Sequence, residues 1–183
     1  MTNPLIADAV KHADLIHGRP ELNAAIIEMG AKIDAALNGE VPVFLSIMHG
    51  GLIFAGALAL CVSTDLYFDY VHATRYRSTL TGGELQWIKK PDVELKGRIV
   101  ILADDILDEG YTLRAIRDFC LERGAKHVLI AVMCRKDHDR TAPGIHADFC
   151  GLKVPDRYVF GFGMDYHGQG RNLPGIYALR EAT

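Results

Sequence analysis

Residues 99–113 constrain the fold of this chain more than any other stretch; they read Ile-Val-Ile-Leu-Ala-Asp-Asp-Ile-Leu-Asp-Glu-Gly-Tyr-Thr-Leu. Four consecutive apolar residues lead to two acids, and such an unalternating run is typical of a parallel strand covered on both faces. The segment that follows predicts a helix, because its apolar residues share one face and a glycine is placed to end it: Leu113, Ile116, Phe119, Cys120 and Gly124. The order strand, loop, helix predicts an open α/β sheet with a ligand site at the carboxyl end of this strand.

The loop at 108–112, Asp-Glu-Gly-Tyr-Thr, has the composition of an anion site. Backbone N–H groups at a helix start favour a phosphate, the threonine adds a hydroxyl, and the glycine allows dihedral angles that let several N–H groups converge. Asp104 and Asp105 would repel a phosphate, so we expect them to serve Mg²⁺ or ribose hydroxyls. Asp108 lies further along, where it could exchange a proton with a bound substrate.

A second loop with the character of an anion site follows the apolar run Val41–Ile47, which predicts a first central strand. His49-Gly50-Gly51 stands directly before a helix expected from Leu52 to Cys61. Two glycines allow close backbone approach, and a helix start favours negative charge. An ordinary structural turn would also explain this pattern.

The remaining chain predicts further elements of an α/β domain. Two helices, over residues 4–16 and from Pro20 to Gly39, are expected to cover the sheet. Strands are expected at residues 66–73, 84–88, 127–133 and 176–179, and the first two form a long hairpin that could fold over the site as a lid.

Composition limits the classes of protein to consider. A chain of 183 residues suits a single domain, residues 1–183. The formal charge of −3 offers no bulk attraction to nucleic acid or to a membrane. Four cysteines without close spacing, and the absence of a cationic leader before an apolar run, predict a reducing compartment, which we take to be the cytoplasm. The apolar N-terminal helices favour a homo-oligomer, a dimer or tetramer.

The stretch 99–113 resembles the phosphoribosyl-pyrophosphate signature of type I phosphoribosyltransferases, and an Asp at position 108 resembles their hypoxanthine-guanine branch. The resemblance extends over roughly residues 41–179. It implies an α/β fold with a central, mainly parallel sheet flanked by helices, a small hood and a mobile lid loop. It also implies transfer of ribose 5-phosphate from phosphoribosyl pyrophosphate to hypoxanthine or guanine, with Mg²⁺ as cofactor.

The resemblance assigns a role to each motif. Asp108 would exchange a proton with N7 of the purine. Contacts to phosphoribosyl pyrophosphate would come from both loops, the paired acids and one arginine: His49, Gly50, Asp104, Asp105, Glu109, Gly110, Tyr111, Thr112 and Arg171. Mg²⁺ would be met by Asp165 together with Asp104 and Asp105, although Asp165 and Arg171 alone would suggest a surface ion pair.

The purine site and the lid are assigned in the same way. Lys136 would donate to the purine O6, with the adjacent Arg135 as the alternative. Tyr158 would stack on the base, and the backbone of Val159 would read its edge; without the resemblance, Tyr158 would be taken as a core aromatic. Arg75 and Tyr76 fall at the lid position.

Three positions depart from the family pattern. His49 replaces a Lys or Arg, so pyrophosphate contact is expected to rest mainly on backbone N–H groups. Glu109 stands where Ser or Thr is usual, so its carboxylate is expected to face away from the phosphate. Arg75 replaces a Ser of the lid. The resemblance also predicts a cis or strained peptide bond between Met48 and His49.

Two other functions remain open. A nucleotide-sensing regulator could keep this fold and bind RNA, although the intact Asp108 and the lack of a Lys/Arg-rich stripe argue against it. A xanthine-preferring phosphoribosyltransferase would differ only in its choice of base.

Overall fold

The computed structural model describes residues 5–75 and 85–180. Its larger sheet has six strands in the order β4-β3-β2-β5-β6-β7. Five of them pair in parallel, and β4 pairs antiparallel with β3 at one edge. The strands are β2 (Val43–Met48), β3 (Tyr67–Arg75), β4 (Leu85–Lys89), β5 (Ile99–Leu107), β6 (His127–Lys136) and β7 (Phe149–Val154). The predicted α/β fold with a mainly parallel central sheet is confirmed.

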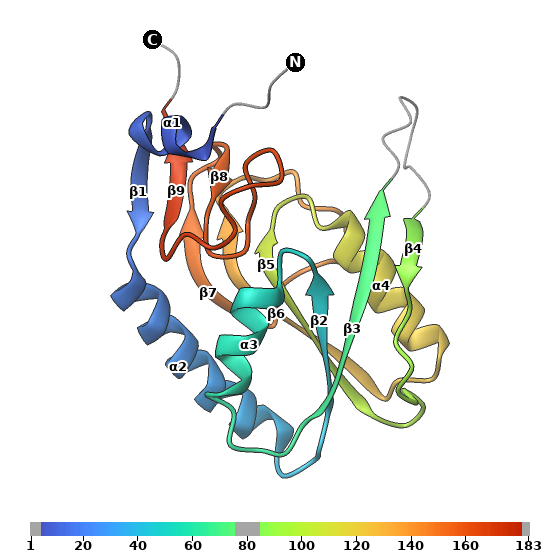
Figure 1. Cartoon of the computed structure of the whole chain (residues 1–183). Coiled ribbons are helices and arrows are strands. Elements are labelled where there is room, and N and C mark those ends of the chain that lie inside the picture. The colour runs from blue at the N-terminus through green and yellow to red at the C-terminus, as the bar shows by residue number, and fades with distance from the viewer. Residues whose placement is uncertain (1–4, 76–84, 181–183) are drawn as a thin grey trace.

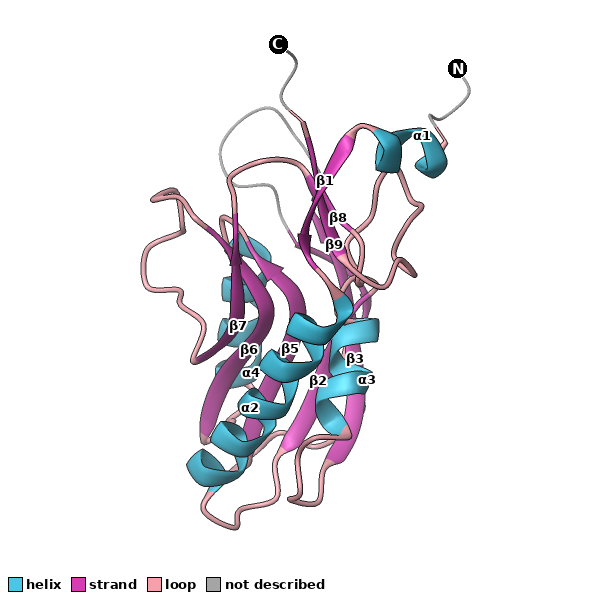
Figure 2. Ribbon diagram, turned by 90° about the vertical axis from the view of Figure 1, so that its left-hand side faces the viewer, coloured by secondary structure: helices cyan, strands magenta, loops and turns pink. Residues whose placement is uncertain are grey.

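Helices cover both faces of the larger sheet (Figures 1 and 2). Helices α2 (Arg19–Leu37) and α3 (Leu52–Ala59) pack on one face, and α4 (Tyr111–Glu122) packs on the other. Successive strand residues alternate between the two cores: Phe44 and Ile101 pack with α2 and α3, whereas Leu45 and Leu102 pack with α4. This two-sided burial explains why the central strands show continuous apolar runs.

A smaller antiparallel sheet has the order β1-β9-β8 and lies beyond the end to which β2 and β3 point (Figure 1). Its strands are β1 (Ala13–His17), β8 (Val159–Phe160) and β9 (Ile176–Leu179), and α1 (Ile6–Lys11) packs beside it around the buried Phe160. This sheet corresponds to the predicted hood.

The prediction for the N-terminal residues was partly wrong. The expected helix over residues 4–16 ends at Lys11, and residues 13–17 form β1, which pairs with β9 at the other end of the chain. Arg157 reinforces this arrangement through an ion pair of 2.7 Å with Asp14. Strand pairing with a distant segment therefore overrides the local helical pattern, and α1 covers the hood and not the larger sheet.

Strands β5 and β6 continue past their predicted ends to Leu107 and Lys136, and β7 was not predicted. The parallel register pairs Leu107 with Arg135, so the residues that follow these two strands emerge side by side. Asp104 and Asp105 accordingly lie within the last part of β5 and not after it. Within the described part of the chain, no helix is long and apolar enough to cross a bilayer.

Candidate active site

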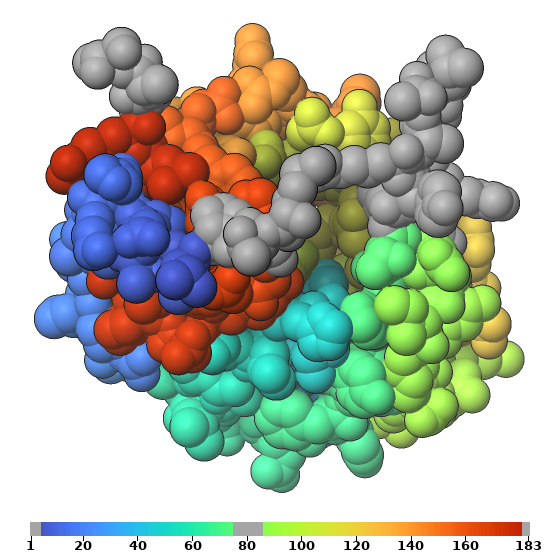
Figure 3. Space-filling model, turned by 45° about the horizontal axis from the view of Figure 1, so that its top comes forward, coloured from blue at the N-terminus to red at the C-terminus, as the bar shows by residue number. Residues whose placement is uncertain are grey.

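A cavity of about 430 Å³ opens at the carboxyl ends of β2 and β5. Figure 3 looks onto this end of the molecule and shows a hollow among the segments coloured cyan, yellow-green and red. The cavity brings together the turn after β2, the paired acids, the loop before α4 and one arginine: His49, Gly50, Asp104, Asp105, Asp108, Glu109, Gly110, Tyr111, Thr112 and Arg171. These predicted residues therefore meet around one space.

The turn after β2 packs closely against β5. The Met48–His49 peptide is cis, as predicted. A Cβ on Gly50 would clash with the Asp105 carboxylate, and a Cβ on Gly163 would clash with the Gly50 carbonyl. The turn after β2, the end of β5 and the segment at Gly163 can therefore meet at the floor of the cavity only because Gly50 and Gly163 lack a side chain.

His49 places an imidazole beside this turn, where many anion sites have a permanent cation. Its ring meets the ring of His72 edge-on, with centroids 4.3 Å apart. Burial, followed by the neighbouring His49, lowers the pKa of His72. A dianionic ligand here would be bound by the backbone N–H groups together with the His49 imidazole.

The paired acids lie in a poorly solvated part of the cavity. Asp105 is buried, and an oxygen of the Asp104 carboxylate accepts the Asp105 backbone N–H at 3.0 Å. Burial raises the pKa of both carboxyls; the charge of Asp105 adds to the effect on Asp104, and the Arg171 guanidinium opposes it. A cation close to these oxygens would stabilise their ionised forms.

This pair fits Mg²⁺ better than a metal held by protein groups alone. Across residues 5–75 and 85–180, no three His, Cys, Asp or Glu side chains are grouped so as to hold a metal ion. Mg²⁺ commonly takes one or two carboxylates and completes its six ligands with substrate phosphates and water. Asp104 and Asp105 supply that number of carboxylates beside an anion cavity.

The loop before α4 presents a helix N-terminus to the same cavity. Gly110 has φ of 77° and precedes the first helical residue, and the Glu109 carbonyl is held by the Ala142 N–H at 2.7 Å. Glu109 itself is exposed. The first turn of α4 contains no acid, so its N–H groups and the Thr112 hydroxyl remain suited to a phosphate.

A smaller cavity of about 230 Å³ adjoins the first, and both are lined by Asp105 and Asp108. Its other lining residues include an aromatic, a lysine and the start of β8: Ile106, Lys136, Tyr158, Val159, Met164 and Asp165. Tyr158 is 48% exposed and is therefore not a core aromatic. Arg135 lines a different cavity, so of the two adjacent cations Lys136 is the one that reaches this space.

Asp108, which lies between the two cavities, is held by two donors. Lys136 Nζ lies 2.8 Å from Oδ2, and His138 Nε2 lies 2.7 Å from Oδ1. Burial opposes ionisation of Asp108, but the hydrogen bonds from Lys136 and then His138 outweigh it, and the pKa of Asp108 is lowered. Asp108 is therefore a carboxylate at neutral pH and acts as a hydrogen-bond acceptor.

Arg171 and Asp165 are paired with each other across the edge of the two cavities. Arg171 Nη2 donates to Asp165 at 2.8 Å, and Nη1 donates to the Gly163 carbonyl at 2.7 Å. Arg171 lines the larger cavity and Asp165 lines the smaller one. Any contact of Asp165 with a metal, or of Arg171 with an anion, would compete with this pair.

Comparison with known proteins identifies the family. A model described as the phosphoribosyl transferase domain matches residues 12–167. The chain belongs to the phosphoribosyltransferase family. This phosphoribosyltransferase is 34% identical over 164 residues to the hypoxanthine-guanine phosphoribosyltransferase of Bacillus subtilis, covering 89% of this chain and 91% of the relative.

Two further relatives cover nearly the whole phosphoribosyltransferase. The hypoxanthine-guanine-xanthine phosphoribosyltransferase of Tritrichomonas foetus is 27% identical over 169 residues, 92% of each chain. The crystal structure of a hypoxanthine phosphoribosyltransferase from Staphylococcus aureus superposes with a TM-score of 0.88 at 27% identity, covering 98% of this chain and 97% of the other. The predicted resemblance is confirmed, and the chain is an enzyme of the hypoxanthine-guanine phosphoribosyltransferase type, which serves purine salvage.

The two residues predicted for the lid of this phosphoribosyltransferase stay predictions, like the roles predicted for the other site residues. Arg75 ends β3, but its side chain lies outside the described residues, as does all of Tyr76. The lid they were predicted to form is thus not described.

His138 is the residue of this phosphoribosyltransferase site that sequence reasoning missed. His138 belongs to none of the motifs used in the sequence analysis: it lies in the loop after β6, 30 positions beyond Asp108, so sequence proximity does not connect the two residues. The one available signal was its place two residues after Lys136, at the end of the strand beside β5.

Proposed function

We propose that this enzyme transfers ribose 5-phosphate from phosphoribosyl pyrophosphate to N9 of hypoxanthine or guanine, with Mg²⁺, and releases IMP or GMP and pyrophosphate. The observation that carries the proposal is a pair of adjoining cavities, one lined by anion loops and acids and the other by Tyr158 and Lys136, with Asp108 between them. A sugar phosphate in the first and a purine in the second would meet beside Asp108.

The larger cavity would hold phosphoribosyl pyrophosphate. The N–H groups of residues 109–112 and the Thr112 hydroxyl would bind the 5′-phosphate, and the turn at His49 and Gly50, with Arg171, would bind the pyrophosphate. Asp104 and Asp105 would hold ribose hydroxyls and the water shell of Mg²⁺, and Asp165 would meet a second ion once its pair with Arg171 opens. Bound Mg²⁺ would neutralise charge on the departing pyrophosphate.

The smaller cavity would hold the base. Tyr158 offers an exposed ring for stacking, the backbone of Val159 would read the purine edge, and Lys136 would donate to an exocyclic oxygen. Adenine carries an amino group where hypoxanthine and guanine carry that oxygen. Lys136 and the amino group would then both be donors, so adenine should be a poor substrate.

Asp108 would act on the proton at N7. An ionised carboxylate only accepts hydrogen bonds, so it favours the tautomer with hydrogen on N7, which leaves the N9 lone pair free. As the bond from N9 to the ribose forms and the bond to pyrophosphate breaks, the N7 proton would pass to Asp108. The site supplies positioning and charge stabilisation for an oxocarbenium-like transition state.

We also propose that residues 1–183 act as one catalytic domain in the cytoplasm, assembled as a dimer or tetramer. Large apolar side chains are exposed on α3, directly after it and on β3, and they support the assembly: Leu52 is 52% exposed, Leu60 90% and Phe68 63%. Sedimentation analysis would measure the oligomeric state, and a monomer at working concentration would contradict this part of the proposal.

One assay tests the function. Purified enzyme with phosphoribosyl pyrophosphate and Mg²⁺ is offered hypoxanthine, guanine, xanthine or adenine, and nucleotide formation is followed with and without a chelator. We expect IMP and GMP, little AMP, and loss of activity with the chelator. Use of xanthine alone would make this the xanthine-preferring type, and RNA binding without any nucleotide synthesis would make it the regulator.

A further inference from the structure

A histidine that no motif marks is buried against the proposed general base. The side chain of His138 is only 4% exposed, and its Nε2 lies 2.7 Å from Oδ1 of Asp108. A histidine this well buried, with a short contact to a carboxylate, is held in one orientation. Its protonation pattern therefore decides what it does for Asp108.

The other ring nitrogen fixes that pattern. The backbone N–H of Arg140 points at His138 Nδ1, at 3.1 Å. Since Nδ1 accepts this hydrogen bond, the ring hydrogen lies on Nε2, which donates to Asp108. A proton on Nδ1 would place two donors face to face, so the ring accepts through Nδ1 and donates through Nε2.

The loop that carries His138 is itself tied to the hood. The Arg140 guanidinium holds both oxygens of Asp156 at 2.7 and 2.8 Å, and Asp156 lies just before Tyr158. Arg140 therefore connects the segment that bears the proposed stacking residue with the backbone N–H that orients His138. An exposed ion pair adds little stability by itself, but the two parallel hydrogen bonds hold Arg140, and with it the loop, in one position beside Asp156.

We propose that His138 is a positioning residue for the reaction: its Nε2–H holds one oxygen of Asp108 in place while Lys136 turns toward the purine oxygen. The inference rests on the proposed function, which gives Asp108 and Lys136 their roles. Without substrate, Lys136 and His138 occupy one Asp108 oxygen each. Once Lys136 donates to the purine oxygen, His138 is the donor that keeps the Asp108 carboxylate directed at N7.

The same geometry excludes a proton relay through His138. Nε2 already carries hydrogen, and Nδ1 is occupied by the Arg140 N–H, so the ring has no nitrogen free to accept a proton from Asp108. The charged groups around the ring are Asp108 after β5, Lys136 at the end of β6, Arg140 in the same loop and Asp156 before the hood. His138 thus acts on the orientation and basicity of Asp108.

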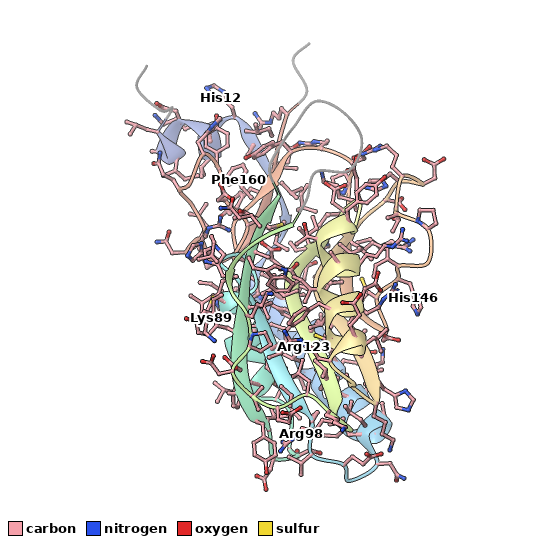
Figure 4. All side chains as sticks on the ribbon, turned by 90° about the vertical axis from the view of Figure 1, so that its right-hand side faces the viewer. His12, Lys89, Arg98, Arg123, His146 and Phe160 are labelled. Atoms are coloured by element: carbon pink, nitrogen blue, oxygen red, sulfur yellow. The ribbon has the colours of Figure 1, made fainter. Side chains whose placement is uncertain are left out.

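Two variants of His138 separate the effect of its hydrogen bond to Asp108 from the effect of its packing. His138→Leu keeps apolar volume without a donor, and His138→Gln keeps an N–H that can reach Asp108. His146→Leu is the matched control, because His146 lies at the outer edge of the molecule and is 79% exposed (Figure 4). Steady-state kinetics with hypoxanthine across pH, thermal melting, and ¹⁵N NMR of labelled histidine in the wild-type enzyme are the measurements.

We expect His138→Leu to lower kcat by roughly 10- to 100-fold, the usual range for losing a hydrogen bond to a charged group, with little change in KM for phosphoribosyl pyrophosphate. Its acid limb should move to higher pH, because one donor that lowers the pKa of Asp108 is gone. His138→Gln should restore both, and His146→Leu should behave as wild type.

A Leu variant with wild-type kcat and pH profile would overturn the inference, and so would a Gln variant as impaired as the Leu variant. If the Leu variant does not fold, NMR of the wild type decides: hydrogen on Nε2 supports the inference, and hydrogen on Nδ1 refutes it. Absence of phosphoribosyl transfer by the wild-type enzyme would instead refute the proposed function.

Discussion

Replacing Asp108 with Asn tests the core of the proposed mechanism. In the structure, Oδ2 of Asp108 accepts from Lys136 at 2.8 Å and Oδ1 accepts from His138 at 2.7 Å. An asparagine has one oxygen and one NH₂ group. Lys136 carries only donors, and His138 also presents a donor since its Nδ1 is occupied, so in either orientation the NH₂ group faces a donor.

The magnitude follows from two losses. A general base contributes about 10² to 10⁴ in rate, so Asp108→Asn should lower kcat by about that factor. The mispaired NH₂ group should also cost on the order of 1 to 3 kcal/mol locally, visible as a lower melting temperature. Binding of phosphoribosyl pyrophosphate should persist, because the N–H groups of residues 109–112 and of the turn after β2 are unchanged.

Kinetics with both substrates varied, together with calorimetric binding of phosphoribosyl pyrophosphate, measure these effects separately. Asp137→Asn is a matched control, because the Asp137 side chain is 68% exposed and its change should leave kcat unaltered. Near-normal turnover of Asp108→Asn on hypoxanthine and guanine would show that Asp108 is only another loop carboxylate. Equal loss of turnover and phosphoribosyl pyrophosphate binding would point to a collapsed site.

Three further changes have distinct expected results. Tyr158→Ala should raise KM for the purine by about tenfold and leave KM for phosphoribosyl pyrophosphate nearly unchanged, since only the base loses a stacking surface; equal effects in steady-state kinetics would contradict this. Gly50→Ala should abolish calorimetric binding of phosphoribosyl pyrophosphate, because its Cβ would clash with the Asp105 carboxylate, and unchanged affinity would disprove that reasoning. Asp69→Asn should lower the free energy of unfolding by about 1 to 3 kcal/mol near neutral pH, since the carboxylate accepts three backbone N–H groups that outweigh burial and lower its pKa. Because the pKa of Asp69 is lowered in the folded state, its stabilising contribution is fully present above the unfolded pKa of about 3.9 and is lost as pH falls through the folded value. The free energies of unfolding of variant and wild type, measured with denaturant, should therefore converge in acid. A difference that stays constant with pH would refute the assignment.

The parts of the fold that were predicted correctly are those whose signal is local. Strands β2 and β5 begin with continuous apolar runs, at residues 43–45 and 99–103, because helices cover both faces of the sheet. Helix α2 shows a 3.6-residue period along its buried face, with Pro20 in its first turn and the predicted stop residue, Gly39, two positions after its last residue. Each of these signals lies within the element or directly beside it.

The hood could not be predicted in the same way. Strand β1 exists because residues 13–17 pair with 176–179, at the opposite end of the chain. Within residues 4–16 the apolar spacing favours a helix, and no local pattern indicates that residues 13–17 pair with β9. Strand β7 is similar, since Gly151 interrupts its apolar pattern and its position depends on parallel pairing with β6.

The proposed purine site shows most clearly what could not be predicted from the sequence, because its geometry depends on strand register. The pairing of Leu107 with Arg135 places the next residues, Asp108 and Lys136, beside each other, and the chain then turns so that His138 reaches the same carboxylate. Shifting one strand by a single residue would reverse the directions of successive side chains and present Arg135 where Lys136 now lies. The sequence contains both cations but does not give the register, so the choice of Lys136 over Arg135 depends on the pairing of β5 with β6 up to their common end.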